Sequence, residues 1–347
     1  MPELTLTIGG RTFWGWKQLT VTRGIEQLAG TFELVAADRW AIDGAAAPIV
    51  PGAECRVSID QTTLITGYVD EVEPTHDGRN HELSIRGRDK TADLVDCVAL
   101  SDGQGWSGRK LSQIAADLCK PFEIPVIVAA DQGEAFKVGR IEPDETVFET
   151  LARAARQRGV LLMSDGLGRL VITRAGDQRA RTPLVLGQNI LAGTGLHSHR
   201  DRFHRYLVRG QSVETSTEAA TAQQVQAESS DAQIRNARVT AVHAWDQMSV
   251  AQAQQLANWT QRTRRGRGQR ATETVRGWLD GSTPWAPNQL VTVKDPWTRV
   301  NGEVLIAQVV YRLDPEQGQR TDLTVVPKSA YELLAEPERD DAFGGEF

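Results

Sequence analysis

The chain has 347 residues, of which 40% are hydrophobic and 24% are charged, and its formal net charge is −6. This composition is ordinary for a soluble globular protein, and the length suggests two to four domains at about 100–200 residues each. The acidic balance gives no reason to expect nucleic acid or an anionic membrane as a partner. No apolar run approaches the roughly 20 residues that span a bilayer.

The first segment, residues 1–97, is predicted to be mostly β. Met1–Ile8 alternates polar and apolar side chains like a strand, and it lacks the charged region of a signal peptide. Similar alternation recurs between glycine turns and favours a first β-barrel domain, in which Trp14 and Trp16 pack. A short helix within Gly87–Asp96 is expected to close the segment.

Residues 98–178 switch to mixed helix and strand, which predicts a small α+β domain. The second of its helices is capped by Asp144 or Thr146, and Thr146 with Glu149 has the spacing of a capping box. The elements expected here are a helix at Leu111–Leu118 ended by Pro121, a helix from about Thr146 to Gly159, and a hairpin of Val160–Met163 with Leu170–Thr173.

The remaining chain is predicted to hold a second β-barrel domain, formed by residues 179–213 and 274–330. Tyr206–Gly210 is its clearest strand. Residues 214–273 are rich in Gln, Ala, Ser and Glu, so they are expected to be an insertion with a flexible stretch and a helix near Val250–Thr263. The tail, residues 331–347, turns polar and glycine-rich and is predicted to be disordered.

Three cysteines, Cys55, Cys97 and Cys119, lie among apolar residues without CxxC spacing. Such cysteines are typical of small buried side chains in a reducing compartment.

A β-hairpin pattern occurs twice, with a separation of 241 residues before the turn and 240 after it. In both copies a hydrophobic strand, an acidic-Pro corner, a glycine turn and a return strand keep their order. Period-two alternation recurs in many unrelated hairpins, so an accidental likeness is the alternative to a duplication. The copies are Leu64–Pro74 with Leu83–Ile85 and Leu305–Pro315 with Leu323–Val325, preceded by the short strands Pro51–Val57 and Pro287–Val293.

No motif for a nucleotide, a metallopeptidase or a serine hydrolase is present. The best metal candidate is His197 and His199 with His204, but no acid or cysteine joins them at ligand spacing, which favours a solvated loop. Glycoside hydrolysis needs two carboxylates across a cleft, and the acids of Asp70–Glu73 lie on a predicted strand surface. We therefore predict no catalytic, cofactor-binding or metal-binding residue, no cofactor and no enzymatic activity.

Five arginines lie within nine residues: Arg262, Arg264, Arg265, Arg267 and Arg270. Such a cluster is able to neutralise phosphates, but no aromatic residue interleaves it for base stacking. A helix C-terminus, whose dipole favours cations, or a contact with another subunit is the favoured interpretation.

The sequence also resembles a known family, the Mu-like phage tail proteins that form the baseplate hub. The resemblance covers nearly the whole chain, and the GRDKTADLVDC block is its most specific part. The residues that carry it are Phe13–Trp16, Val21–Leu34, Gly67–Asp70, Gly87–Cys97, Glu145–Phe148 through Arg156–Gly159, and Trp285–Val291.

This resemblance implies a structural virion protein of a contractile tail, phage or prophage, located in the tail baseplate and present in the host cytoplasm during assembly. It implies a homotrimeric ring with two related β-barrels per subunit, bound to a tail tube protein and a central spike protein. Six near-equivalent platforms then match a six-fold tube. The alternatives are a hub-associated cell-wall hydrolase and a nucleic-acid-binding module that uses the arginines.

Overall fold

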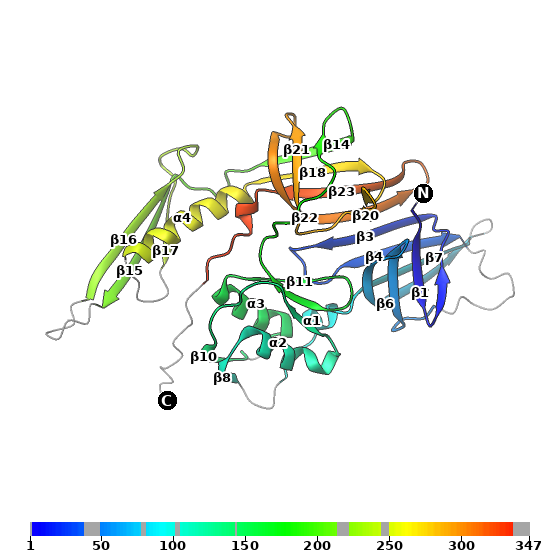
Figure 1. Ribbon diagram of the computed structural model, residues 1–347, viewed down its shortest axis with the longest axis horizontal. Coiled ribbons are helices and arrows are strands. Elements are labelled where there is room, and N and C mark those ends of the chain that lie inside the picture. The colour runs from blue at the N-terminus through cyan, green and yellow to red at the C-terminus, as the bar shows by residue number, and fades with distance from the viewer. Residues whose placement is uncertain are drawn as a thin grey trace.

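Figure 1 shows the computed structural model, which describes residues 2–37, 49–77, 81–100, 105–142, 144–213, 222–243 and 250–335. The described chain is mainly β with few helices, as the alternating sequence predicts. It consists of a large sheet, a small α/β unit below the sheet and an arm that projects from one end (Figure 1). No helix in these ranges is long and apolar enough to cross a membrane.

The large sheet has 13 strands, hydrogen-bonded in the order β14-β18-β23-β22-β3-β4-β7-β6-β5-β1-β2, with β21 joined to β22 and β13 to β21. Its N-terminal strands are β1 (Leu4–Ile8), β2 (Arg11–Phe13), β3 (Gln18–Gly24), β4 (Thr31–Ala37), β5 (Glu54–Ile59), β6 (Thr62–His76) and β7 (His81–Asp89). Its C-terminal strands are β13 (Leu184–Val185), β14 (Ile190–His197), β18 (Gln269–Arg276), β21 (Leu290–Asp295), β22 (Val300–Asp314) and β23 (Gly318–Val326). A separate small sheet pairs β19 (Leu279–Asp280) with β20 (Thr283–Pro284).

The two halves of the large sheet repeat one strand order. The series β3-β4-β7-β6-β5 in the first half corresponds to β14-β18-β23-β22-β21 in the second. In each half the 15-residue strand carries a one-residue bulge, at Asp70 in β6 and at Ala307 in β22. The residue just before the bulge, Val69 or Ile306, bonds through both its N–H and its C=O to the chain that leads into the neighbouring short strand. The halves therefore share register as well as order.

These bulges correct the alignment of the repeated hairpin. They lie 237 residues apart, at positions 70 and 307, whereas the apolar pattern matched positions 241 apart. A shift of four residues leaves the same face buried, because side chains alternate across a strand, so the pattern alone did not detect the shift. Glu73 and Pro74, expected at a corner, lie inside β6.

The strands close into no barrel within the described ranges, which corrects the expectation of two β-barrels. The two halves instead merge along an antiparallel junction, from Gln308 opposite Gly24 to Leu313 opposite Leu19. Within these ranges β21 pairs only with the part of β22 before the bulge, and β3 pairs with the part after it. This pairing removes two exposed strand edges from the subunit.

One hydrophobic core extends along both halves of the sheet. Leu6, Leu34 and Ile85 of the first half and Val293 and Val309 of the second are all completely buried in it. Full burial of such a side chain contributes about 1.5–3 kcal/mol. Of the two tryptophans predicted to pack inside the first half, Trp16 is buried, whereas Trp14 is 56% exposed.

The small α/β unit has its own core, in which the predicted helix face Leu111–Leu118 is buried. The capping box is confirmed: the Thr146 hydroxyl accepts from Glu149 N at 3.2 Å, and the Glu149 carboxylate accepts from Thr146 N at 2.9 Å. Gly159 ends this helix with φ 61°. The unit consists of α1 (Ala92–Asp96), β8 (Gly105–Arg109), α2 (Leu111–Cys119), a 3-10 turn (Lys120–Phe122), β9 (Val126–Val128), β10 (Phe136–Arg140), α3 (Val147–Arg158), β11 (Leu161–Ser164) and β12 (Leu170–Thr173).

The arm consists of β15 (Arg205–Val213), β16 (Ala222–Ser230), β17 (Val239–His243) and α4 (Val250–Arg267). Tyr206–Gly210 belongs to β15, which pairs with β16 and β17. This strand was expected in the second barrel, but it belongs to the arm and not to the large sheet. A three-stranded sheet with its own helix satisfies the backbone of β15 locally. After β23 the chain forms a second 3-10 turn (Lys328–Ala330), and residues 336–347 of the predicted tail lie outside the described ranges.

Candidate assembly surfaces

The histidines singled out as a metal candidate do not form a site. His197 Nε2 lies 2.8 Å from the Thr298 carbonyl oxygen, and His204 Nδ1 lies 3.1 Å from the Asp231 carbonyl oxygen, so each ring has its own backbone partner. Within the described residues, no group of three or more His, Cys, Asp or Glu side chains is placed to hold a metal ion.

The acids considered for hydrolysis form ion pairs on the exposed face of the sheet. Asp70 accepts from Arg88 Nε at 2.7 Å, while Glu71 and Glu73 each accept from Arg86 Nη1 at 3.2 Å. Cross-strand pairs of this kind neutralise charge on an antiparallel sheet. Asp70 also lines a small pocket with Asp89 and Asp93, where Arg88 is its ion-pair partner.

The arginine cluster divides into two groups. Arg270 is paired with Glu26, and the Arg264 guanidinium lies 5.3 Å from the centre of the Phe203 ring. Arg262, Arg265 and Arg267 are exposed at the C-terminal part of α4. Four of the five arginines thus lie in the C-terminal part of α4 and Arg270 lies in β18, and three of the helix arginines are exposed on the surface.

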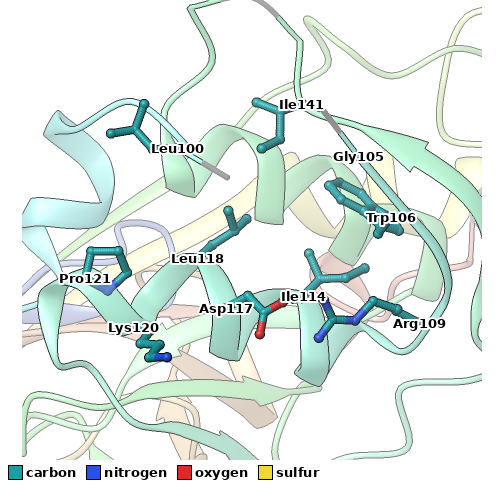
Figure 2. Close-up of a pocket in the computed structure, with 10 residues that line it drawn as sticks. All are labelled: Leu100, Gly105, Trp106, Arg109, Ile114, Asp117, Leu118, Lys120, Pro121 and Ile141. Carbon is teal, nitrogen blue, oxygen red and sulfur yellow. Dashed lines mark hydrogen bonds and ion pairs between the residues drawn. The ribbon is translucent and has the colours of Figure 1, made fainter. Parts of the chain in front are cut away.

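A cavity of about 600 Å³ lies in the small α/β unit. An ion pair between Arg109 and Asp117 lies along its wall, and Asp117 is the one carboxylate among the described residues of the lining (Figure 2). Those described residues include no second acid for glycoside hydrolysis and no Ser, Cys or His nucleophile. The residues around it are Leu100, Gly105, Trp106, Arg109, Ile114, Asp117, Leu118, Lys120, Pro121 and Ile141.

Two strand edges of the large sheet are open in the subunit. In the described chain β14 pairs only with β18, and it exposes Leu191 and Leu196 by 44% and 59%. Within the part of the chain that the structure describes, the stretch of β6 beyond its bulge, residues 71–76, pairs only with β7. Unpaired backbone donors and acceptors along an edge are a template for another strand.

A buried acid pair that no sequence motif indicated lies next to β14. Glu273 and Asp295 are 0% and 1% exposed, and Glu273 Oε1 accepts from the Thr298 hydroxyl at 2.9 Å. Burial raises the pKa of Glu273, and the nearby Asp295 charge raises it further, against the opposing effect of Thr298. A Cβ at Gly193 of β14 would lie 2.6 Å from Glu273 Oε2, so a larger residue there would require the Glu273 side chain to move.

Three family models match successive parts of this chain. Residues 3–89 match the N-terminal part of the Mu phage baseplate assembly protein GpP-like family, and residues 249–334 match the fourth domain of GpP. Residues 91–174 match the second domain of the baseplate hub protein gp44-like family. All three matches are to baseplate families, so the chain is a phage baseplate protein.

The chain is 32% identical to the baseplate hub protein gp44 of Escherichia phage Mu, over 99% of this chain and 92% of that protein. It belongs to the family of this Mu phage baseplate hub protein, which is structural and not enzymatic. This membership confirms the prediction of no enzymatic activity and excludes the alternative of a cell-wall hydrolase.

Solved structures share the fold. The 43 kDa tail protein of prophage MuSo2 from Shewanella oneidensis is 35% identical with a TM-score of 0.84, covering 96% of this chain and 100% of that chain. The E. coli c3393 protein, a type VI secretion component described as similar to the T4 tail proteins gp27 and gp5, is 11% identical with a TM-score of 0.58, covering 96% of this chain and 80% of that chain. The latter likeness concerns the fold alone.

Proposed function

We propose that three copies of this chain form the hub ring of a contractile tail, which joins the tail tube to the central spike. The repeated strand order in the large sheet supports this proposal most strongly. Because each subunit carries two halves with the same order and register, a trimer presents six related platforms around its axis.

The number of platforms matters because the proposed partners differ in symmetry. A tail tube built of six-fold rings needs six similar contacts, whereas the spike that it drives is proposed to be three-fold. Heterologous contacts between the first half of one subunit and the second half of the next close such a ring by rotation. The two unrelated parts of the subunit, the α/β unit and the arm, then each occur three times.

The proposed division of labour follows the division of the chain. Residues 1–97 and the second-half strands form the platforms for the tube, the α/β unit of residues 98–178 lies outside or below the ring, and the arm lies at a subunit boundary. The protein assembles in the host cytoplasm and uses no cofactor. Its exposed arginines meet acids of a neighbouring subunit and bind no specific nucleic acid.

Light scattering coupled to size-exclusion chromatography tests the ring. We expect a mass about three times the 38.1 kDa of one chain. The mass should persist on dilution to micromolar concentration. A monomer under these conditions would count against a hub ring of this chain alone.

A further inference from the structure

The junction between the two halves of one subunit provides a template for a contact between subunits. In this junction residues 308–313, the part of β22 after its bulge, pair antiparallel with β3, and Tyr311 lies opposite Val21. Its counterpart in the first half, residues 71–76 beyond the β6 bulge, has no such partner among the described residues of the subunit. The counterpart of β3 in the second half is β14, whose outer edge is also open.

The register of each half identifies which residues correspond. Opposite the residue before the bulge stand Gly87 in β7 and Val325 in β23. In the first half, Gly87 pairs with Phe32 of β4, and Phe32 pairs in turn with Val21 of β3. In the second half, Val325 pairs with Ala271 of β18, and Ala271 pairs in turn with Gly195 of β14. Gly195 is therefore the counterpart of Val21. Pro74 is the counterpart of Tyr311, because each lies four residues after the bulge of its strand.

Resting on the trimer proposed above, we infer that residues 71–76 of one copy pair antiparallel with residues 193–198 of the next copy, with Pro74 opposite Gly195. The same junction then occurs six times around the ring, three times within subunits and three times between them. Pro74 has no N–H, which suits it to a strand edge and costs the new ladder no more than one bond. The contact covers the open β14 edge and buries part of Leu196.

Charge on the outer face of this contact is complementary. In the inferred register Glu73 faces Leu196 of the neighbour, and Leu196 stands opposite Arg270 on β18. Two strand spacings put the Glu73 and Arg270 backbones about 10 Å apart, within the combined reach of both side chains. Ser198, opposite Glu71, donates to the Gly268 carbonyl at 2.8 Å, so the exposed Arg267 lies beside that end. Arg270, which is paired with Glu26 inside the subunit, and the exposed Arg267 thereby come near Glu73 and Glu71 of the other copy, and these two acids share Arg86.

Paired cysteines test the register. In a Cys97→Ser background, we expect Glu73→Cys with Leu196→Cys, and likewise Thr75→Cys with Thr194→Cys, to form disulfide-linked dimers and trimers on mild oxidation. The products should run as a ladder in non-reducing electrophoresis, and reductant should remove it. Directly opposite strand residues bring their Cβ atoms to about 4.5–5.5 Å.

The matched control is Glu33→Cys with Leu196→Cys, because Glu33 is exposed on the same sheet but two strands from the inferred edge; it should remain largely uncrosslinked. A trimer by light scattering without selective cross-linking of the two opposite pairs would overturn this interface and leave the ring standing. A monomer by light scattering would overturn both.

Discussion

The arm is held at its base by a buried ion pair, and its removal is expected to loosen the arm as a unit. Arg202 donates to Asp231 Oδ2 from Nη2 at 2.6 Å and from Nε at 3.1 Å, and to Gln233 Oε1 at 2.8 Å. The Arg202 and Asp231 side chains are 3% and 1% exposed. Arg202→Ala would leave the Asp231 carboxylate buried without its counter-charge, which costs about 3–5 kcal/mol.

That cost is expected in the local opening equilibrium of the arm. At 1.36 kcal/mol per tenfold change, amide hydrogen exchange in β15 and β16 should accelerate roughly 150- to 5,000-fold. Exchange in the distant strands β4 and β7 should change little. Hydrogen exchange followed by mass spectrometry of peptides measures both regions in one experiment.

A matched control lies on the same arm, where Arg205 is paired with Glu228 at 2.5 Å on the exposed surface. Arg205→Ala should leave exchange nearly unchanged, since water screens an exposed pair. The double variant Arg202→Ala with Asp231→Ala should be less damaging than Arg202→Ala alone, because no charge is stranded. Equal effects of Arg202→Ala and Arg205→Ala would refute this reasoning.

Two further predictions concern titratable groups. Burial raises the pKa of the Cys55 and Cys119 thiols to about 12, so iodoacetamide at pH 8 should label only the exposed Cys97 in the native protein and all three in urea; rapid native labelling of a second thiol would contradict the burial. Because the pKa of Glu273 is raised in the folded state, its contribution to stability is present below the ordinary glutamate range and lost as pH rises through the raised pKa. Glu273→Gln should therefore gain melting temperature relative to wild type as pH rises, and parallel pH curves for the two proteins would contradict a raised pKa of Glu273.

Local features of the fold followed from the sequence because they depend on near neighbours. The capping box of Thr146 with Glu149 and the glycine end of that helix need only a few consecutive residues, and both are present. The buried face of α2 follows from its 3.6-residue period. The repeated hairpin was recognisable because period-two alternation records which face is buried.

Non-local pairing did not follow from the same pattern. A bulge has no distinctive sequence, so the two hairpins were aligned on their apolar pattern alone. That alignment differs by four residues from the one that superposes the bulges at Asp70 and Ala307. The choice of β3 as partner of β22, which joins the halves and prevents separate barrels, depends on edges far apart in the chain. The same is true of β15, whose alternation suits either sheet.

The candidate surfaces were partly accessible to sequence reasoning. The arginine cluster was visible as a run, but its division into the bound Arg264 and Arg270 and three exposed cations depends on Phe203 and Glu26, which lie elsewhere in the chain. The buried pair of Glu273 and Asp295 had no sequence signal, because each acid alternates within an ordinary strand. Only their common approach to Gly193 distinguishes them.

We propose that three copies of this chain form a ring with six related platforms. Electron microscopy of the purified full-length protein tests it most directly. We expect particles with a central hole, three-fold symmetry and six similar densities around the inner wall, with the arms and α/β units repeating three times. Particles without a hole, or a closed ring whose two halves contribute unlike densities to the wall, would contradict it.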